Sequence, residues 1–459
     1  LFGVDVMPLA VEIARMRLWL QVFAGAPLDL LQPASKAPLP NLSMRIRCGD
    51  SLVPQLAGVQ VVLGRGRKLI PADWADRIAR WQREKGLFFH NDPGCSYRTA
   101  DQMLSAERAL LSDLVDLRIR AVERPGGGKA QAIETGLRQA RLAQQALSLA
   151  KDLPFVWDSA FIEVFGQGRR GFDLVIGNPP YLRQELIQDP DWSIGGEPSA
   201  DGRAYKDKLA LTVHSLWPSV FDYDWRANRA RRRLDPRCDL YVYFCLHGLS
   251  LLDAQGVLCF VVSSAWLDAR YGKDLQEFLL TRGRVQMIID NQALRTFARA
   301  EINTVILLLG AAWDTKSANP ERLRHQVRFV ALNLPFDQAL DSSLWRGVAT
   351  ACSRGRDESY RTLAIQQGEL LERGMHPEKR VYVGEKWGGK YLRAPEIYWL
   401  LLEQCRDRLV SLGQVANVRR GITTGANDFF FLNGQESAQC GIESEFLSPA
   451  VKHPRECPR

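Results

Sequence analysis

The sequence predicts an α/β fold in which helices cover a largely parallel sheet. Two features lead to this prediction. Short apolar segments alternate with longer amphipathic segments, and several of the apolar segments end at an acidic or amide residue. Short apolar runs are typical of buried strands, and amphipathic segments are typical of covering helices. Ligands bind at the carboxyl ends of strands in open α/β sheets, so the polar residues found there are candidate site residues.

The alternation begins at once, over residues 1–58. Residues 1–6 form a predicted strand that ends at Asp5, and Pro8 begins an amphipathic helix that continues to about residue 23. Residues 44–48 form the next predicted strand, which leads into Gly49-Asp50-Ser51. Strand, acid, helix, strand, acid is the order of a doubly wound sheet. We therefore assign residues 1–58 to the first part of the sheet-containing domain.

Residues 59–150 form a predicted helical insertion. The leucines of this segment recur at three- and four-residue steps, as on one face of a helix, and include Leu104, Leu110, Leu111, Leu114 and Leu117. Gly126-Gly127-Gly128 divides the segment into two helical parts, which predicts a helical hairpin. The favoured interpretation is a spacer or support arm.

The α/β pattern returns after residue 150. The predicted strands are residues 172–176, 257–262, 285–289 and 303–309, and the predicted helices are residues 240–252 and 272–281. The character of the sequence changes near residues 326–335, and beyond them it is mixed. Residues 151–335 are therefore assigned to the second part of the same domain, and residues 336–459 to a separate C-terminal domain.

The composition excludes several classes of protein. Of the 459 residues, 46% are hydrophobic and 24% are charged, which excludes extended disorder and collagen-like order. The net charge of +8 permits a polyanionic partner without requiring one. The nine cysteines include no C-x-x-C pair, so a zinc ribbon is unsupported and reduced thiols are expected. The longest apolar stretches are too short to cross a bilayer, and no membrane association is expected.

The strongest functional signal is the segment from Asp173 to Tyr181, which reads DLVIGNPPY. An apolar strand delivers an amide, two prolines and an aromatic ring to its carboxyl end. Proline has no backbone N–H, so the turn presents acceptors, namely the amide oxygen of Asn178 and the carbonyl oxygen of Pro179. An exocyclic amino group that attacks a methyl group becomes positively charged, and such acceptors stabilise that charge. Tyr181 adds a flat face on which an extruded base can stack.

The sequence FDLVIGNPPYLRQE at residues 172–185 resembles motif IV of the adenine-N6 DNA methyltransferases. Further segments are similar to motif II (residues 1–20), motif III (48–52), motifs V and VI (239–280) and motifs VII and VIII (288–309). Residues 411–432 resemble the beginning of the target-recognition domain in type IIG and related enzymes. The order of these segments, with the catalytic motifs before the recognition domain, is that of the gamma class.

This resemblance implies a Rossmann-like S-adenosylmethionine-dependent methyltransferase sheet, with the insertion at residues 59–150 and a target-recognition domain at residues 336–459. The glycine-rich motif I, which holds the methionine end of the cofactor, belongs before residue 1 in this pattern. We therefore expect the sheet to be incomplete at its amino end and the recognition domain to be incomplete. A segment without motif I is expected to bind the cofactor poorly by itself.

The resemblance also implies a cofactor site at the ends of the first two strands. Asp5 accepts hydrogen bonds from the ribose hydroxyls of S-adenosylmethionine, and Val6 packs on its adenine ring. Asp50 accepts from the adenine amino group, with Ser51 nearby. Methyl transfer runs directly from the sulfonium to the amino nitrogen, so neither a metal nor a covalent enzyme intermediate is expected.

A site for the target base is implied at the turn after residue 177. Asn178 and Pro179 hold N6 of an adenine that has been flipped out of duplex DNA. Pro180 stiffens the turn, and Tyr181 stacks on the base. Phe297, in the segment that resembles motif VIII, contacts the base from the other side.

Double-stranded DNA is the expected partner. Six arginines lie between residues 226 and 237, among them Arg229 and Arg232. Such side chains bind phosphates and make affinity depend on salt, although a solvated loop without a partner is the alternative. Arg419 and Arg420 lie in the recognition segment, where contacts to bases or phosphates and a structural role are equally compatible with the sequence.

The sequence therefore predicts a site-specific, adenine-specific DNA methyltransferase of a restriction-modification or phage-defence system. Its expected location is the cytoplasm of a prokaryotic cell, in association with the nucleoid. Two alternatives stay open. One is an amino-methyltransferase that acts on RNA or protein, and the other is a DNA-binding specificity subunit that keeps a degenerate methyltransferase fold. The sequence does not predict the oligomeric state.

Overall fold

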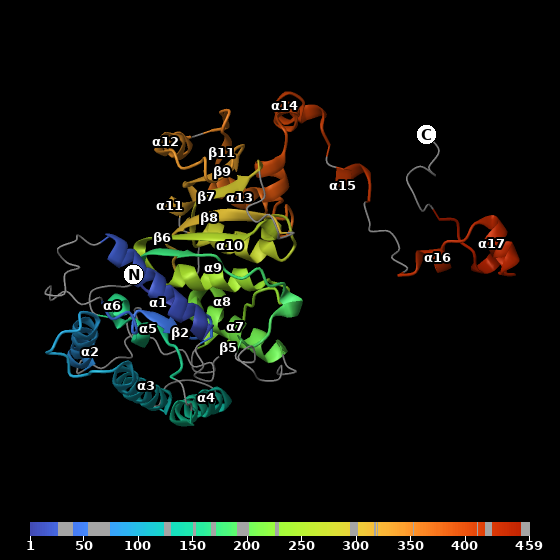
Figure 1. Ribbon diagram of the computed structural model, residues 1–459. Coiled ribbons are helices and arrows are strands. Elements are labelled where there is room, and N and C mark those ends of the chain that lie inside the picture. Colours follow the sequence, from blue (N-terminus) through green and yellow to red (C-terminus); the bar gives the residue numbers. More distant parts are fainter. Residues whose placement is uncertain are drawn as a thin grey trace. The chain divides into compact units, whose positions relative to one another are not determined.

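The computed structural model divides the chain into two compact units, Leu1–Ala394 and Pro395–Arg459 (Figure 1). It describes residues 1–25, 40–53, 74–123, 130–149, 153–166, 171–190, 202–224, 229–293, 302–315, 318, 320–351, 353–410, 412–417 and 425–450. All predicted site residues that fall within these ranges belong to the first unit.

A seven-stranded sheet forms the centre of the first unit. In sheet order its strands are β10 (Gly355–Arg356), β11 (Tyr360–Gln366), β9 (Gln326–Leu332), β7 (Arg284–Asn291), β8 (Thr304–Gly310), β6 (Leu252–Ser263) and β3 (Phe172–Gly177). β3 is parallel to β6, and β7 is parallel to β9, whereas β8 is antiparallel to both of its neighbours. The carboxyl ends of β3, β6 and β7 therefore lie at one edge of the sheet.

The predicted α/β sheet is confirmed, but it is mixed rather than fully parallel. β8 pairs antiparallel with both β7 and β6 and so runs against the other strands at the centre of the sheet. Fully buried residues such as Leu258 of β6 and Leu307 of β8 account for the apolar runs. α9 (Leu240–Ser250) packs on β6, and α10 (Gly272–Thr281), which has the predicted bounds, packs on β7.

A second, two-stranded parallel sheet contains β1 (Gly3–Asp5) and β2 (Ile46–Cys48). α1 (Pro8–Gly25) follows β1 in the chain and buries Val11 against Ile46 of β2. The order of strand, helix and parallel strand is the one predicted for the first 58 residues.

An aromatic cluster joins this small sheet to β3. Phe2, next to the start of β1, lies with its ring centroid 5.7 Å from that of Phe172, at the start of β3. Phe161, between α5 (Trp157–Ala160) and α6 (Ile162–Phe165), contacts both rings. The two strands therefore begin close together within one hydrophobic core.

Apolar surface is uncovered beside β1 and β3. Among the described residues, β1 pairs only with β2 and β3 only with β6. Leu174 and Ile176 of β3 are 56% and 74% exposed. Exposed apolar side chains also follow one another at helical spacing along α1, namely Leu9, Ile13, Met16, Leu20 and Phe23. A patch of this kind marks a surface that packs against something else.

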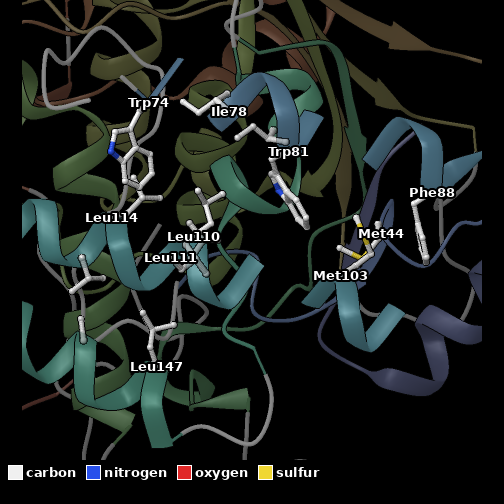
Figure 2. Close-up of a cluster of buried hydrophobic side chains, with 14 of the residues drawn as sticks. Met44, Trp74, Ile78, Trp81, Phe88, Met103, Leu110, Leu111, Leu114 and Leu147 are labelled. Carbon is white, nitrogen blue, oxygen red and sulfur yellow. The ribbon is translucent and has the colours of Figure 1, made fainter. Parts of the chain in front are cut away.

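The segment predicted as a helical insertion contains α2 (Trp74–Phe89), α3 (Ala100–Glu123) and α4 (Ala130–Leu149). Figure 2 shows the side chains of its core, which include Trp74 and Trp81 of α2, Leu111 of α3 and Leu147 of α4. α3 and α4 form the expected pair, and α2 is a further helix. The three glycines at residues 126–128 lie outside the described residues.

Buried charges tie the insertion to the rest of the unit. Arg47 of β2 pairs with Glu107 of α3 at 2.8 Å, and their side chains are 5% and 0% exposed. The hydroxyl of Ser159 donates to the same carboxylate at 2.9 Å. Lys85 of α2 pairs with Glu163 of α6 at 3.0 Å. Buried ions persist only when their partners are in place, so the three helices are a fixed part of the domain.

The chain after residue 335 first completes the same unit. α12 (Ser342–Thr350), α13 (Gln367–Arg373) and the helical turn η5 (Gly388–Arg393) belong to it, as does α11 (Pro320–Leu323) before residue 335. Arg393 donates to the hydroxyl of Ser264 at 3.2 Å and pairs with Asp268 and Asp290 at 3.3 and 3.5 Å. The boundary predicted at residue 336 thus falls inside this unit, because β11 pairs with β9, and where a recognition domain begins stays a prediction.

Short elements account for the remaining described residues. Between β3 and α9 lie η2 (Gln184–Leu186), α7 (Gly202–Leu216), α8 (Pro218–Phe221), β4 (Tyr223–Asp224) and β5 (Arg229–Ala230), and η4 (Ser264–Leu267) follows β6. The second unit contains α14 (Glu396–Gln404), η6 (Arg406–Arg408), α15 (Leu412–Val415), α16 (Asn427–Phe430), α17 (Gly434–Gln439) and η7 (Ser444–Phe446).

Candidate active site

The acceptor turn (residues 178–181) follows β3 at the carboxyl edge of the sheet. Gly177 ends the strand against the ring of Phe260, and an added Cβ would lie 3.0 Å from that ring. Pro179 is buried, whereas Asn178 is exposed. The hydroxyl of Tyr181 donates to the amide oxygen of Asn178 and, at 3.4 Å, to the carbonyl of Val261. Burial raises the pKa of this hydroxyl, which keeps it protonated as a donor.

The chain beyond the turn is held by the start of α9. The backbone N–H of Leu240 donates to the carbonyl of Leu182 at 3.1 Å, and the backbone N–H of Gln184 donates to the Asp239 carboxylate at 3.0 Å. The other carboxylate oxygen of Asp239 accepts from the Tyr271 hydroxyl at 2.6 Å. These hydrogen bonds hold the backbone of residues 182–184, which follow the acceptor turn, against the start of α9.

Asp5 ends β1 with an exposed side chain. One carboxylate oxygen accepts from the backbone N–H of Met7 at 2.8 Å. Asp5 is in register with Cys48, the last residue of β2, and its carbonyl accepts from the backbone N–H of Gly49 at 3.0 Å. Val6, the next residue, is half-buried. Asp5 and the segment that follows β2 are therefore neighbours.

Asp50 lies in that segment and is half-buried. One oxygen accepts from the backbone N–H groups of Leu52 and Val53 at 2.8 and 3.1 Å. The other accepts from the hydroxyl of Tyr205 at 2.7 Å. Burial raises the pKa of the Asp50 carboxyl, nearby Asp189 raises it further, and the three hydrogen bonds oppose this shift.

The residues on either side of Asp50 are fixed by two aromatic side chains. At Gly49, an added Cβ would lie 2.4 Å from the Cβ of Phe155, so only glycine fits there without a shift of its neighbour. The carbonyl of Ser51 accepts from the indole N–H of Trp157 at 2.8 Å. The position of Asp50 is thus set by contacts from three separate parts of the chain.

The small sheet and β3 are linked both where their strands begin and in the segments that follow them. β1 and β3 begin close together at Phe2 and Phe172. The segments after β2 and β3 meet neighbouring residues of α7, because Tyr205 reaches Asp50 and Lys206 donates to the side-chain oxygen of Gln184 at 3.0 Å. The segment that holds Asp50 and the segment that continues the acceptor turn are thus connected through α7, and the carbonyl of Asp5 is bonded to the first of these segments at Gly49.

Two further predicted residues are exposed arginines, and three lie outside the described residues. Arg229 is exposed on the hairpin of β4 and β5. Arg232 is exposed and lies 4.0 Å from Glu277 of α10. Phe297, Arg419 and Arg420 lie outside the described residues.

Tyr205, Asp239 and Trp157 are site residues that the sequence alone did not indicate. Tyr205 is separated from Asp50 by 155 positions, and no spacing rule connects them. Asp239 has the sequence appearance of a residue that caps α9, but its carboxylate holds Gln184 and Tyr271 instead of its own helix. Contacts of this kind depend on the folded chain.

The described residues contain neither a candidate metal site nor a candidate membrane-spanning helix. No group of three or more His, Cys, Asp or Glu side chains there is arranged to hold a metal ion. None of the described helices has the length and apolar character needed to cross a membrane.

Comparison with known proteins finds restriction-modification methyltransferases. Type II methyltransferase M.BstVI of Geobacillus stearothermophilus is 25% identical over 292 residues, which are 61% of this chain and 40% of that protein. Type II methyltransferase M.PaeR7I of Pseudomonas aeruginosa is 28% identical over 119 residues, which are 26% of this chain and 15% of that protein. The chain therefore spans about two fifths of the length of the first of these relatives.

A solved structure and a family model also match. The type IIG restriction endonuclease BpuSI has a TM-score of 0.34 at 15% identity, over 87% of this chain and 51% of that one. The family model described as Eco57I restriction-modification methylase matches residues 1–297, the span that contains both acids and the acceptor turn. Because that match covers well over half of its 459 residues, the chain belongs to the Eco57I restriction-modification methylase family.

Proposed function

We propose that this protein transfers a methyl group from S-adenosylmethionine to N6 of an adenine in duplex DNA, as the modification activity of a restriction-modification or phage-defence system. The observation that carries the proposal is the acceptor turn after β3, whose following residue Gln184 is linked through α7 to Asp50. Membership of the methylase family and similarity to type II methyltransferases support it. The activity belongs in the cytoplasm of a prokaryotic cell, at the nucleoid.

In this proposal the acceptor turn binds the nucleophile. The amide oxygen of Asn178 has two lone pairs, of which the Tyr181 hydroxyl uses one and the target amino group takes the other. The carbonyl of Pro179 accepts the second N–H. Both oxygens stabilise the positive charge that develops on the nitrogen, and the two prolines keep them in place. The ring of Tyr181 stacks on the adenine after the base leaves the duplex.

The residues after β1 and β2 fit the cofactor. The exposed carboxylate of Asp5 suits the two donors of a ribose diol, and half-buried Val6 offers an apolar contact to the adenine ring. Asp50 is held in a fixed orientation and keeps lone pairs for an amino donor, with Ser51 beside it. When bound, S-adenosylmethionine supplies the methyl group on a positively charged sulfur, which is a good leaving group. The residues of the site orient the cofactor and the target base and stabilise the charge that develops during methyl transfer.

We also propose that the glycine-rich turn of the cofactor site lies between β1 and β3. Two facts support this location. Among the described residues β1 pairs only with β2 and β3 only with β6, and apolar side chains of both β3 and α1 are exposed. A strand and a helix packed there would pair both edges and cover Leu174, Ile176 and the exposed side of α1.

DNA contacts are proposed at four arginines and one phenylalanine. Arg229 and Arg232, which are both exposed, bind phosphates. Arg419 and Arg420 bind DNA from the recognition segment. Phe297 contacts the target base opposite Tyr181.

The proposal is tested by methyl transfer with the full-length gene product. Tritiated S-adenosylmethionine is incubated with unmethylated plasmid DNA, with RNA and with a protein extract, using wild type and the variants Asn178→Ala and Asn178→Asp. We expect label in DNA alone, none with Asn178→Ala, and part of the activity with Asn178→Asp, which keeps an acceptor oxygen. Circular dichroism and thermal unfolding check that both variants fold.

The other possible results separate the alternatives. Label in RNA or protein but not in DNA identifies an amino-methyltransferase with a different substrate. Binding of cofactor-free protein to DNA without any transfer identifies a specificity subunit. Unchanged DNA methylation by Asn178→Ala overturns the assignment of the acceptor turn.

A further inference from the structure

Two adjacent residues in the first turn of α7 reach the two halves of the candidate site. The hydroxyl of Tyr205 donates to the Asp50 carboxylate at 2.7 Å, and the ammonium of Lys206 donates to the side-chain oxygen of Gln184 at 3.0 Å. Asp50 follows β2, and Gln184 is three residues beyond Tyr181. One helical turn thus contacts both the segment proposed for the cofactor and the segment that continues the acceptor turn.

The helix behind this turn is firmly packed. Tyr205 is itself buried, and the next turns of α7 bury Leu209, Thr212 and Val213. α7 also packs on α9, whose preceding residue Asp239 accepts from the backbone N–H of Gln184. Because close-packed side chains resist independent displacement, a change at Tyr205 is transmitted to Lys206 and Gln184.

The charges near the bridge come from three segments. The negative charge of Asp189, which follows η2, raises the pKa of the Asp50 carboxyl. Its effect on this pKa is smaller than the effects of burial and of the hydrogen bonds. Lys208, two residues beyond Lys206, pairs with Asp189 at 3.3 Å from a half-exposed position. Lys208 carries the same charge as Lys206 and lies on the same helix. None of its described hydrogen bonds goes to Asp50 or Gln184. It is therefore a matched control for Lys206.

We propose that Tyr205 and Lys206 are positioning residues that couple cofactor binding to binding of the target base. This coupling rests on the proposed function of the site. A donor from the cofactor adds a further hydrogen bond to the Asp50 carboxylate that Tyr205 already holds. The additional restraint passes through α7 to Gln184 and the acceptor turn before DNA arrives. DNA binding accordingly loses less conformational entropy when the cofactor is present. By linkage, DNA tightens cofactor binding by the same factor.

The coupling is measured as a ratio of two dissociation constants. The full-length gene product is titrated with S-adenosylhomocysteine, which binds without transferring a methyl group, in the absence and presence of a short duplex that the wild type methylates. We expect DNA to tighten binding by about fivefold or more in the wild type. Tyr205→Phe weakens binding of S-adenosylhomocysteine in the absence of DNA and reduces the ratio toward one. Lys206→Met leaves binding without DNA unchanged but also reduces the ratio.

Two controls separate positioning from general effects. Lys206→Arg keeps a donor for Gln184 and restores the ratio, whereas Lys208→Met removes one positive charge from α7 and keeps the wild-type ratio. A wild-type ratio of one, or a full ratio in both Tyr205→Phe and Lys206→Met, overturns the coupling while leaving the methyltransferase intact. Absence of DNA methylation by the wild type overturns the proposed function itself, before the coupling is measured.

Discussion

The hydroxyl of Tyr181 donates a hydrogen bond to the side-chain oxygen of Asn178, three residues earlier in the same turn. The aromatic ring and the amide are thus held as one unit, and the carbonyl of Val261 offers the hydroxyl a second, longer contact. Tyr181 therefore has two separable parts, a ring that can stack on a base and a hydroxyl that orients the acceptor.

Two substitutions at Tyr181 distinguish these parts. Tyr181→Phe keeps the ring and removes the hydroxyl, so we expect methylation to continue with a modest loss of kcat. Tyr181→Ala removes the stacking face and should weaken transition-state stabilisation by about 1–3 kcal/mol. Steady-state kcat/KM for both variants gives the comparison. Equal losses in the two variants would show that no base stacks on this ring.

Asp50 predicts a pH dependence of cofactor affinity. Burial raises the pKa of its carboxyl, so the group takes up a proton at a less acidic pH than an ordinary aspartate. The ionised form accepts an amino donor best, and affinity should therefore fall as the pH decreases through that raised value. The folded state disfavours the ionised form, so Asp50→Asn should not destabilise the protein near neutral pH.

Calorimetric titration of S-adenosylmethionine across the acidic range tests this expectation. Asp50→Asn should bind more weakly at neutral pH and lose the acid-dependent decrease. If the variant keeps the wild-type pH profile, the decrease comes from another group and Asp50 does not contact the cofactor.

Glu107 should be essential to stability, although it lies outside the candidate site. Its carboxylate is buried against Arg47 and Ser159, so Glu107→Ala leaves an unpaired buried guanidinium and should cost about 3–5 kcal/mol. Asp113→Ala is the control. Asp113 lies on α3, as Glu107 does, but its pair with Arg77 of α2 is exposed, so its loss should cost no more than about 1 kcal/mol. Urea unfolding measures both, and similar small losses would mean that the insertion is only loosely attached.

Arg232 should contribute to the salt dependence of DNA binding. Its exposed guanidinium has Glu277 at 4.0 Å and remains available to a phosphate. Arg237 makes two hydrogen bonds to Asp235, which neutralise it locally. Arg232→Gln is therefore expected to lower the slope of log affinity against log salt by about 1, and Arg237→Gln by less. Identical slopes in the wild type and Arg232→Gln would leave the arginine segment as a solvated surface.

Local sequence predicted the parts of the fold that depend on local spacing. The bounds of α10 and the ends of β1, β2 and β3 follow from apolar periodicity and from the polar residue after each strand. α2 carried a readable signal as well, because Trp74, Ile78, Trp81, Lys85 and Phe88 recur on one face. Lys85 makes this face hard to recognise as a buried one, because a lysine is buried only beside an opposite charge. Its partner Glu163 is distant in sequence.

Long-range pairing was beyond the reach of such reasoning. β11 joins the sheet by pairing with β9, and the sequence of residues 360–366 alone does not specify that partner. The contact of Tyr205 with Asp50 likewise depends on how α7 packs on α9. The positions of Asn178, Asp5 and Asp50 at strand ends were predictable, whereas the side chains that orient them were not.

The most direct measurement is the identity of the methylated nucleoside. Unmethylated plasmid DNA is incubated with the full-length gene product and S-adenosylmethionine, digested to nucleosides and analysed by liquid chromatography and mass spectrometry. The acceptor turn predicts N6-methyldeoxyadenosine in the wild-type reaction and none with Asn178→Ala. A product methylated only on cytosine, or DNA that stays unmodified while RNA or protein gains the methyl group, would contradict adenine as the substrate of this site.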